Sequence, residues 1–289
     1  MDTTTLLWTL AATISAGAQV FISKIVAHEH RDAAFNGMMM YGISGAIAAL
    51  ILIAHPWPHD WLLGALLGIF AGSIHSLGNY IRIESLKHIE SVIYFPLNKL
   101  LGPLVVVVAA VVWFGDALTL REYIGIALSL TVPLFLISAG EHHRQKNLRF
   151  GLVLMVQSTI LTSVSVLFSK EALVRTSDVL FIIGAAQLAG TLCSMAILSK
   201  QKGVRTMVSH IDRRDISLGL ITGILAFAST YTLFEALSTG LVSIVYVIQA
   251  HYILIPIVLA VWWYKEHMNI RKGIAIVVSL LAISVLYSG

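Results

Sequence analysis

The chain has 289 residues, of which 57% are hydrophobic and 12% are charged, and its mean hydropathy is +0.86. A soluble domain carries about 25% charged residues, so this composition excludes a soluble protein and indicates a polytopic membrane protein. The net charge of +4 requires no nucleic-acid partner, because membrane topology itself places basic residues in loops. The single cysteine, Cys193, excludes an internal disulfide.

Apolar segments long enough to cross a bilayer as helices follow one another along the chain. The sequence predicts ten spans, at 5–27, 34–54, 61–83, 91–113, 119–139, 150–173, 179–199, 216–238, 242–264 and 270–288. The N-terminus carries an acid and no base before its apolar run, so we expect a permanent first helix rather than a cleaved signal peptide. Short connections predict helix hairpins packed side by side.

Basic residues gather in the loops that follow spans one, three, five, seven and nine. They are Arg31, Arg82, Lys87, Arg144, Lys146, Arg149, Lys200, Lys202, Arg205, Arg213, Arg214, Lys265, Arg271 and Lys272. The alternate loops hold little beyond Arg121 and Arg175. By the positive-inside rule the basic loops are cytoplasmic and both termini lie outside. We expect an integral, multi-pass protein of a bacterial or archaeal inner (plasma) membrane.

The two halves of the chain repeat each other. At one offset of 151 residues, three residues of span three match three of span eight: Gly68, Gly72 and Glu84 match Gly219, Gly223 and Glu235. After a one-residue slip, Tyr94 and Lys99 match Tyr246 and His251, and in spans one and six Lys24 parallels Lys170. Five spans in each half is an odd number, so the second half enters the membrane from the opposite side. This is an inverted-topology repeat, the architecture of many secondary transporters.

Further motifs mark a family. A lysine ends the first span of each half, and the acid-led segments FGDALTLREYIG and YKEHMNIRKGIA precede the last helix of each half. With the five-helix repeats, these features resemble the drug/metabolite transporter superfamily, and most closely its EamA-like members. The resemblance covers the whole chain and implies a ten-helix, all-α fold with a central cavity lined mainly by spans three, four, eight and nine and by spans one and six. It divides the chain into a first repeat at 1–140, a basic linker at 141–149 and a second repeat at 150–289. Where the family usually has Gly-Glu, this chain has Gly115-Asp116 and Lys265-Glu266, and this structural motif leaves the substrate open.

The stretch YFPLNKLLGP, residues 94–103, places Lys99 inside span four. A charge at membrane depth costs about 3 kcal/mol, so it normally faces protein or a watery cavity. Tyr94 and Asn98 are four residues apart and share a helix face with Lys99 beside it, and Pro96 and Pro103 predict kinks. A snorkelling or structurally paired lysine is the alternative.

Span nine carries the matching set, with Tyr246, Gln249 and His251 before Pro256. Two helices from inverted halves would face one another across the pseudo-twofold axis, so we predict that Lys99 and His251 are paired substrate contacts. In the resembled family, members that carry phosphorylated sugars use basic residues on the helices equivalent to spans four and nine. The resemblance therefore implies an anionic substrate. The chain shows no cluster of several bases, which favours a carboxylate or a mixed-charge metabolite over a phosphate.

Other polar residues within the spans are further candidates. His75, Asn79 and Arg82 form one stripe of span three, either lining the cavity or forming an interhelical hydrogen-bond ladder. His75 and His251 titrate near neutral pH and are candidates for proton coupling. Candidates for ion coupling or a gate are Glu235, Lys24 and Lys170, with an interfacial or snorkelling position as the alternative.

The sequence predicts no enzyme, no cofactor and no metal site, because it contains no HExxH, CxxC or GxSxG motif and no P-loop. We expect a secondary active transporter of a small polar, anionic or mixed-charge metabolite that works by alternating access. One alternative is a proton-coupled exporter of amino acids or amphipathic drugs in which Lys99 is structural. Another is a lipid-linked precursor flippase or a non-transporting membrane scaffold. The expected partners are a small-molecule substrate, the lipid bilayer and a coupling H⁺, with a homodimer left open.

Overall fold

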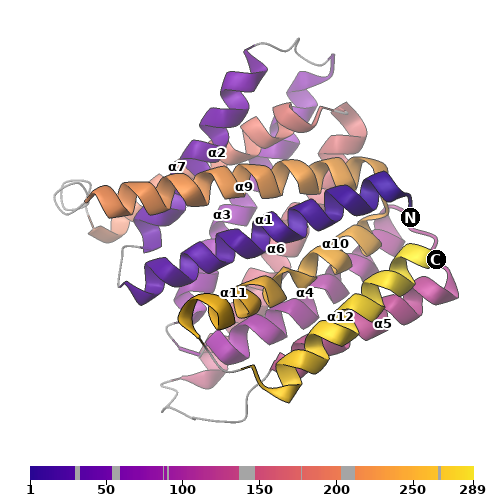
Figure 1. Ribbon diagram of the computed structural model, residues 1–289. Coiled ribbons are helices and arrows are strands. Elements are labelled where there is room, and N and C mark those ends of the chain that lie inside the picture. The colour runs from indigo at the N-terminus through magenta and orange to yellow at the C-terminus, as the bar shows by residue number, and fades with distance from the viewer. Residues whose placement is uncertain are drawn as a thin grey trace.

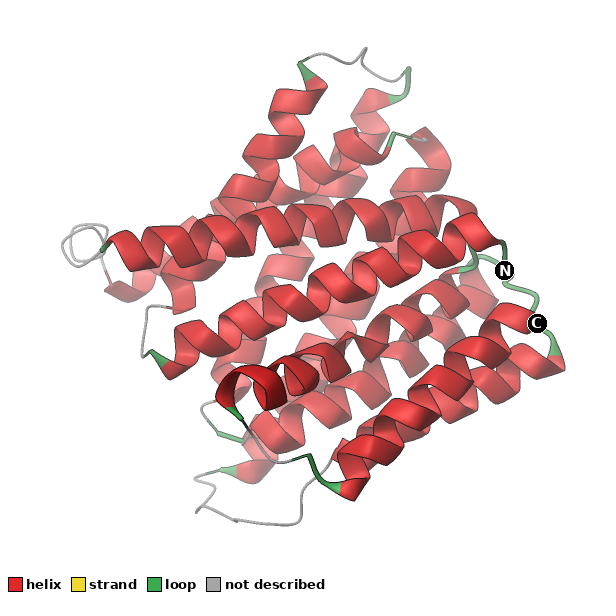
Figure 2. Ribbon diagram, viewed as in Figure 1, coloured by secondary structure: helices red, strands yellow, loops and turns green. Residues whose placement is uncertain are grey.

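A computed structural model describes residues 1–29, 33–53, 59–86, 88–89, 91–136, 147–176, 178–202, 212–265 and 268–289. The regular structure of this part of the chain is helical throughout (Figure 2). The helices are α1 (Thr3–His28), α2 (Ala33–Leu52), α3 (Trp61–Leu86), α4 (Ser91–Trp113), α5 (Leu120–Leu136), α6 (Leu148–Thr176), α7 (Val179–Lys202), α9 (Arg213–Thr239), α10 (Val242–Ala250), the 3₁₀ turn η1 (His251–Ile253), α11 (Leu254–Tyr264) and α12 (Ile270–Ser288).

Each of the ten predicted spans corresponds to one helix, except that α10, η1 and α11 together form the ninth. Within the described ranges, nine segments are long and apolar enough to cross a membrane. The tenth span is α5, whose 17 described residues reach the lower limit for a transmembrane helix. Most of the expected linker at 141–149 lies outside the described residues, and α6 begins at Leu148.

The helices form exchanged pairs, in which a helix of one half packs against helices of the other half. The third helix of each half packs against the first two helices of the other half, so α3 contacts α6 and α7, while α9 contacts α1 and α2. Counterpart helices also contact each other, in the pairs α2–α7, α4–α10 and α5–α12. Figure 1 shows the α5–α12 pair and the α2–α7 pair on opposite sides of the long central helices. The fold thus brings the equivalent helices α4 and α10 together at the interface of the two halves.

Both termini lie at the same end of the molecule (Figure 1). The Thr3 hydroxyl on α1 lies 3.1 Å from the hydroxyl of Tyr287 on α12. An even number of spans requires this arrangement, because each span reverses the side of the membrane on which the chain emerges.

Glycines hold the exchanged pairs at close range. A Cβ atom on Gly72 of α3 would lie 2.0 Å from the carbonyl oxygen of Ala186 on α7, and one on Gly223 of α9 would lie 2.5 Å from Cβ of Ile43 on α2. These glycines occupy matching positions of the sequence repeat, and small residues at such faces let helix backbones approach closely. Both glycines therefore pack against a helix of the other half.

The prolines of spans four and nine have different effects. Pro256 has no N–H and its ring crowds the carbonyl four residues earlier, at Tyr252, and the chain there tightens into the turn η1 (His251–Ile253). In contrast, Pro96 and Pro103 lie within the continuous helix α4. Span nine is therefore interrupted before its proline, whereas in span four, for which kinks were predicted, the helix is continuous through both prolines.

Candidate functional site

Lys99 faces the ring of Tyr252 across the interface between the two halves. Its Nζ atom lies 4.2 Å from the ring centroid, within the range of a cation–π contact. Both residues are half-buried. At 1.5 Å per residue, Lys99 lies about 12 Å from the start of α4 and Tyr252 about 15 Å from the start of α10. Because these spans run in opposite directions through a bilayer core of about 30 Å, both residues fall near its middle.

Arg82, near the end of α3, adds a second positive charge to this region. It interacts electrostatically with four surrounding side chains, those of Tyr41, His75, Tyr94 and Tyr252. The charge of Lys99 acts on His75 and Tyr252 as well. Within the described part of the chain, neither Lys99 nor Arg82 forms an ion pair with a carboxylate. The region around Lys99, Arg82 and Tyr252 is therefore electropositive.

The stripe on α3 is bonded to α2 through Tyr41. The amide nitrogen of Asn79 donates to the Tyr41 hydroxyl, and the Tyr41 and His75 rings meet edge to face with centroids 6.3 Å apart. Both His75 and Asn79 remain half-buried. Asn79 therefore forms an interhelical hydrogen bond, which was the alternative to lining the cavity. The imidazole of His75 borders the electropositive region.

Two residues of the YFPLNKLLGP stretch hold α4 against α6. The Tyr94 hydroxyl lies 2.7 Å from the Ser158 hydroxyl, and Tyr94 is only 1% exposed. The Asn98 amide nitrogen donates to the Thr159 hydroxyl at 2.7 Å while the side chain stays half-buried. Tyr94 therefore belongs to the packed core, and Asn98 keeps surface accessible beside Lys99.

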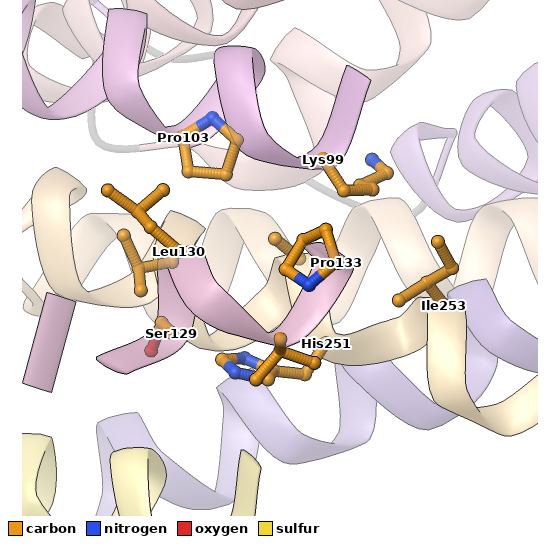
Figure 3. Close-up of a pocket in the computed structure, with 10 residues that line it drawn as sticks. Lys99, Pro103, Ser129, Leu130, Pro133, His251 and Ile253 are labelled. Carbon is orange, nitrogen blue, oxygen red and sulfur yellow. The ribbon is translucent and has the colours of Figure 1, made fainter. Parts of the chain in front are cut away.

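His251 lines the same small cavity as Lys99, but the two side chains point in different directions in Figure 3. His251 is 5% exposed, and its Nδ1 atom lies 3.1 Å from the carbonyl oxygen of Ile248. Gln249 is also buried. Tyr246 is half-buried, and its hydroxyl lies close to Gly102 of α4. The residue that meets the Lys99 ammonium from the second half is Tyr252 rather than His251.

The sequence prediction did not include Tyr252 or Tyr41 among the candidates. For Tyr252 a signal existed, because Lys99 precedes Pro103 by four residues and Tyr252 precedes Pro256 by four. Matching the prolines gives an offset of 153 residues and pairs Lys99 with Tyr252. The tyrosine match, at an offset of 152, paired it with His251 instead. For Tyr41 no comparable signal exists.

Lys170 and Asp116 fix the tight turn between α9 and α10. The Lys170 ammonium donates to the carbonyl oxygen of Leu237 and, at 3.3 Å, to that of Gly240, which satisfies acceptors at the C-terminus of α9. Asp116, 7% exposed, accepts from the backbone N–H of Ser243 at 3.0 Å and from its hydroxyl. It thus caps α10, whose own N-cap residue, Leu241, makes no side-chain cap. Lys170 has the contacts of a helix cap.

Two candidates remain, Glu235 and Lys24. Glu235 is half-buried, and its carboxylate acts on the hydroxyl of Tyr231. The ring of Tyr231 in turn meets Trp8 of α1 edge to face, with centroids 5.9 Å apart. The side chain of Lys24 lies outside the described residues.

Two inverted five-helix units that enclose an electropositive interior at mid-membrane define a polytopic membrane transporter of the drug/metabolite type. Residues 3–138 and 149–288 each match the model of the EamA-like transporter family, and the chain belongs to this family. Members of the family are transporters rather than enzymes. Thirty chains of solved structures match. One, described as "Crystal structure of protein", is 18% identical with a TM-score of 0.71 over 95% of each chain, and shares the fold. A search of curated proteins gave no match.

Proposed function

We propose that the protein is a secondary active transporter that moves a small polar metabolite, anionic or of mixed charge, by alternating access. The observation that carries this proposal is the Lys99 ammonium, half-buried at mid-membrane with no carboxylate partner among the described residues. A cation at this depth costs about 3 kcal/mol. An anionic substrate that binds beside it offsets that cost, and so gains affinity.

A second positive charge extends the binding region toward one side of the membrane. Arg82 lies near the end of α3. Both Arg82 and Lys99 interact electrostatically with His75 and Tyr252. The two positive charges raise the local concentration of anions in the region between Arg82 and Lys99. Asn98 supplies a polar group at the site, and the rings of Tyr246 and Tyr252 supply amphipathic walls.

A proton-coupled exporter of amino acids or amphipathic drugs is the second candidate. It is favoured by the contact between Lys99 and the Tyr252 ring, because a cation–π pair already stabilises the ammonium by about 1 kcal/mol or more. In this case Lys99 joins the two halves and the substrate binds elsewhere in the interior. His75 is then a candidate for proton exchange, because its titratable imidazole borders the electropositive region.

The proposed location is a bacterial or archaeal inner membrane with the basic loops in the cytoplasm and both termini outside. Support comes from the positive-inside rule and from the termini, which lie at the same end of the molecule.

A ligand screen on purified protein tests the proposal. The thermal stability of the wild type, Lys99→Gln and Arg149→Gln is measured with anionic, zwitterionic and cationic metabolites. Arg149 is exposed at the start of α6, so it controls for the loss of one positive charge. A ligand that binds only the folded state adds about 2.7 kcal/mol at a hundredfold excess over its dissociation constant. We expect an anion to stabilise the wild type and Arg149→Gln but not Lys99→Gln.

The outcome separates the two candidates. If cations or neutral amino acids stabilise the wild type and Lys99→Gln equally, Lys99 does not bind substrate and the exporter replaces the first proposal. Uptake of the stabilising ligand into proteoliposomes then establishes transport, and a scaffold would show none.

A further inference from the structure

A small, partly open cavity lies between the two halves of the molecule, beside the turn η1. Residues of α4, α5, α10 and η1 line it, among them Lys99, Ser129, Pro133 and His251 (Figure 3). Its volume is about 10 Å³. A buried water molecule needs about this much room.

Two buried polar atoms on the wall of this cavity have no hydrogen-bond partner among the described residues, the Ser129 hydroxyl oxygen and Nε2 of His251. Ser129 is 7% exposed and His251 is 5% exposed, so bulk water reaches neither to any useful extent. Figure 3 shows the Ser129 hydroxyl and the His251 imidazole on the same side of the cavity. Leaving such groups unbonded costs about 1–3 kcal/mol each, and buried polar groups in native proteins are nearly always bonded.

The hydrogen-bonding roles of His251 follow from its other ring nitrogen. Nδ1 faces the carbonyl oxygen of Ile248 at 3.1 Å, and a carbonyl oxygen only accepts, so Nδ1 carries a proton. In the neutral imidazole Nε2 is then an acceptor that needs a donor. Pro133 lies four residues after Ser129 and has no N–H, so the Ser129 carbonyl lacks its usual helical donor. The same turn of α5 therefore offers both a hydroxyl and a carbonyl oxygen.

We propose that one water molecule occupies this cavity and bridges Ser129 of α5 to His251 of η1. The water donates to Nε2 of His251 and bonds to the Ser129 hydroxyl. A water molecule fits better than a metal cation, because the lining offers no carboxylate and includes Lys99. The bridge joins the first half of the chain to the second at the point where span nine changes from an α-helix to a 3₁₀ turn. It does not depend on which substrate the protein carries.

Ser129→Ala tests the bridge by the sign of its effect on thermal stability. If the water is present, the substitution removes one of its partners, and we expect the unfolding midpoint of the purified protein to fall by about 2 °C or more. If the cavity is dry, the substitution removes an unbonded hydroxyl, and the midpoint stays or rises. Ser44→Ala on α2 is the matched control, because the Ser44 hydroxyl is fully buried and also unbonded, but lies outside this cavity. We expect no loss of stability for Ser44→Ala.

A double-mutant cycle with His251→Leu completes the test. Neither side chain bonds to the other directly, so additive effects of Ser129→Ala and His251→Leu overturn the proposal and non-additive effects support it. Measurements in sodium chloride and in choline chloride identify the occupant. A wild-type midpoint that depends on sodium, and loses this dependence in Ser129→Ala, replaces the water with a cation. Density for an ordered water between the two residues in a high-resolution structure confirms the bridge, and an empty cavity there overturns it.

Discussion

At the scale of single residues, the surroundings of a lysine decide what it does. Lys99 and Lys170 both lie within membrane-spanning helices and are both half-buried. Lys170 donates to carbonyl oxygens at the end of α9, so its charge offsets the negative end of a helix dipole. The Lys99 ammonium instead lies above the face of an aromatic ring, which leaves it able to bind a further anion. Of these two lysines, Lys99 is the one that we propose as a substrate contact.

Asp116 is the residue whose loss we expect to destabilise the turn between α9 and α10 most directly. Asp116→Ala leaves the Ser243 N–H and hydroxyl without their acceptor in a buried position. We expect a loss of about 1–3 kcal/mol in the free energy of unfolding, measured by thermal unfolding in detergent. Asp116→Asn retains an acceptor oxygen and serves as the comparison, with a smaller loss. Equal stability of Asp116→Ala and the wild type would contradict the capping role.

At the scale of helices, close approach matters more than helix propensity. The small faces of α3 and α9 are equivalent in the sequence repeat, and each lies against a helix of the other half. A larger side chain at such a contact forces the helices apart, because packed interiors leave no room to absorb it. Substitutions at the contacts between the two halves therefore test how closely these helices pack.

Gly72→Ala and Gly37→Ala make a matched pair for this idea. At Gly72 the new Cβ would lie 2.0 Å from the Ala186 carbonyl oxygen, whereas at Gly37 no described atom lies within 4 Å. We expect Gly72→Ala to cost about 1–3 kcal/mol, and Gly37→Ala to be neutral or to add up to about 1 kcal/mol through the better helix propensity of alanine. Unfolding midpoints of the two variants check this. A stable Gly72→Ala protein would mean that α3 and α7 are not packed this closely.

At the scale of the whole molecule, the exchanged pairing of helices turns a sequence duplication into a two-fold arrangement. Helix α3 of the first half packs on the second half, and α9 of the second half packs on the first. Neither five-helix unit therefore buries its third helix without the other unit. The same arrangement brings α4 and α10 together, with Lys99 and Tyr252 near mid-membrane. Rocking of such halves about a central site is how inverted repeats exchange access.

Orientation in the membrane is testable with the single native cysteine removed. In a Cys193→Ser background, Thr4→Cys marks the end that carries the termini, and Arg213→Cys marks the start of α9 at the other side; both positions are exposed. With the basic loops in the cytoplasm, we expect a membrane-impermeant thiol reagent added to intact cells to label Thr4→Cys and not Arg213→Cys. Both should react after the membrane is permeabilised. The reverse pattern in intact cells would invert the proposed topology.

The spans and the duplication were accessible from the sequence because each rests on a local property. A bilayer core of about 30 Å demands about 20 apolar residues per helix, so span limits such as 91–113 and 270–288 coincide with α4 and α12. The glycines at 68, 72, 219 and 223 repeat at a fixed offset, and their role in packing follows from their size alone. The sequence also singled out Lys99, since a charge within an apolar run needs no coordinates to be recognised.

What faces Lys99 was decided by the tertiary structure. Repeat symmetry specifies equivalent helices but not their register or rotation, and one residue of register separates His251 from Tyr252, about 100° around a helix of 3.6 residues per turn. The 3₁₀ turn before Pro256 alters that rotation further. Likewise, the roles of Lys170 and Asp116 depend on the end of α9 and the start of α10, which lie far from them in sequence. Sequence determines which segments enter the membrane, because that depends on local hydrophobicity, whereas contacts between distant side chains depend on how the helices pack.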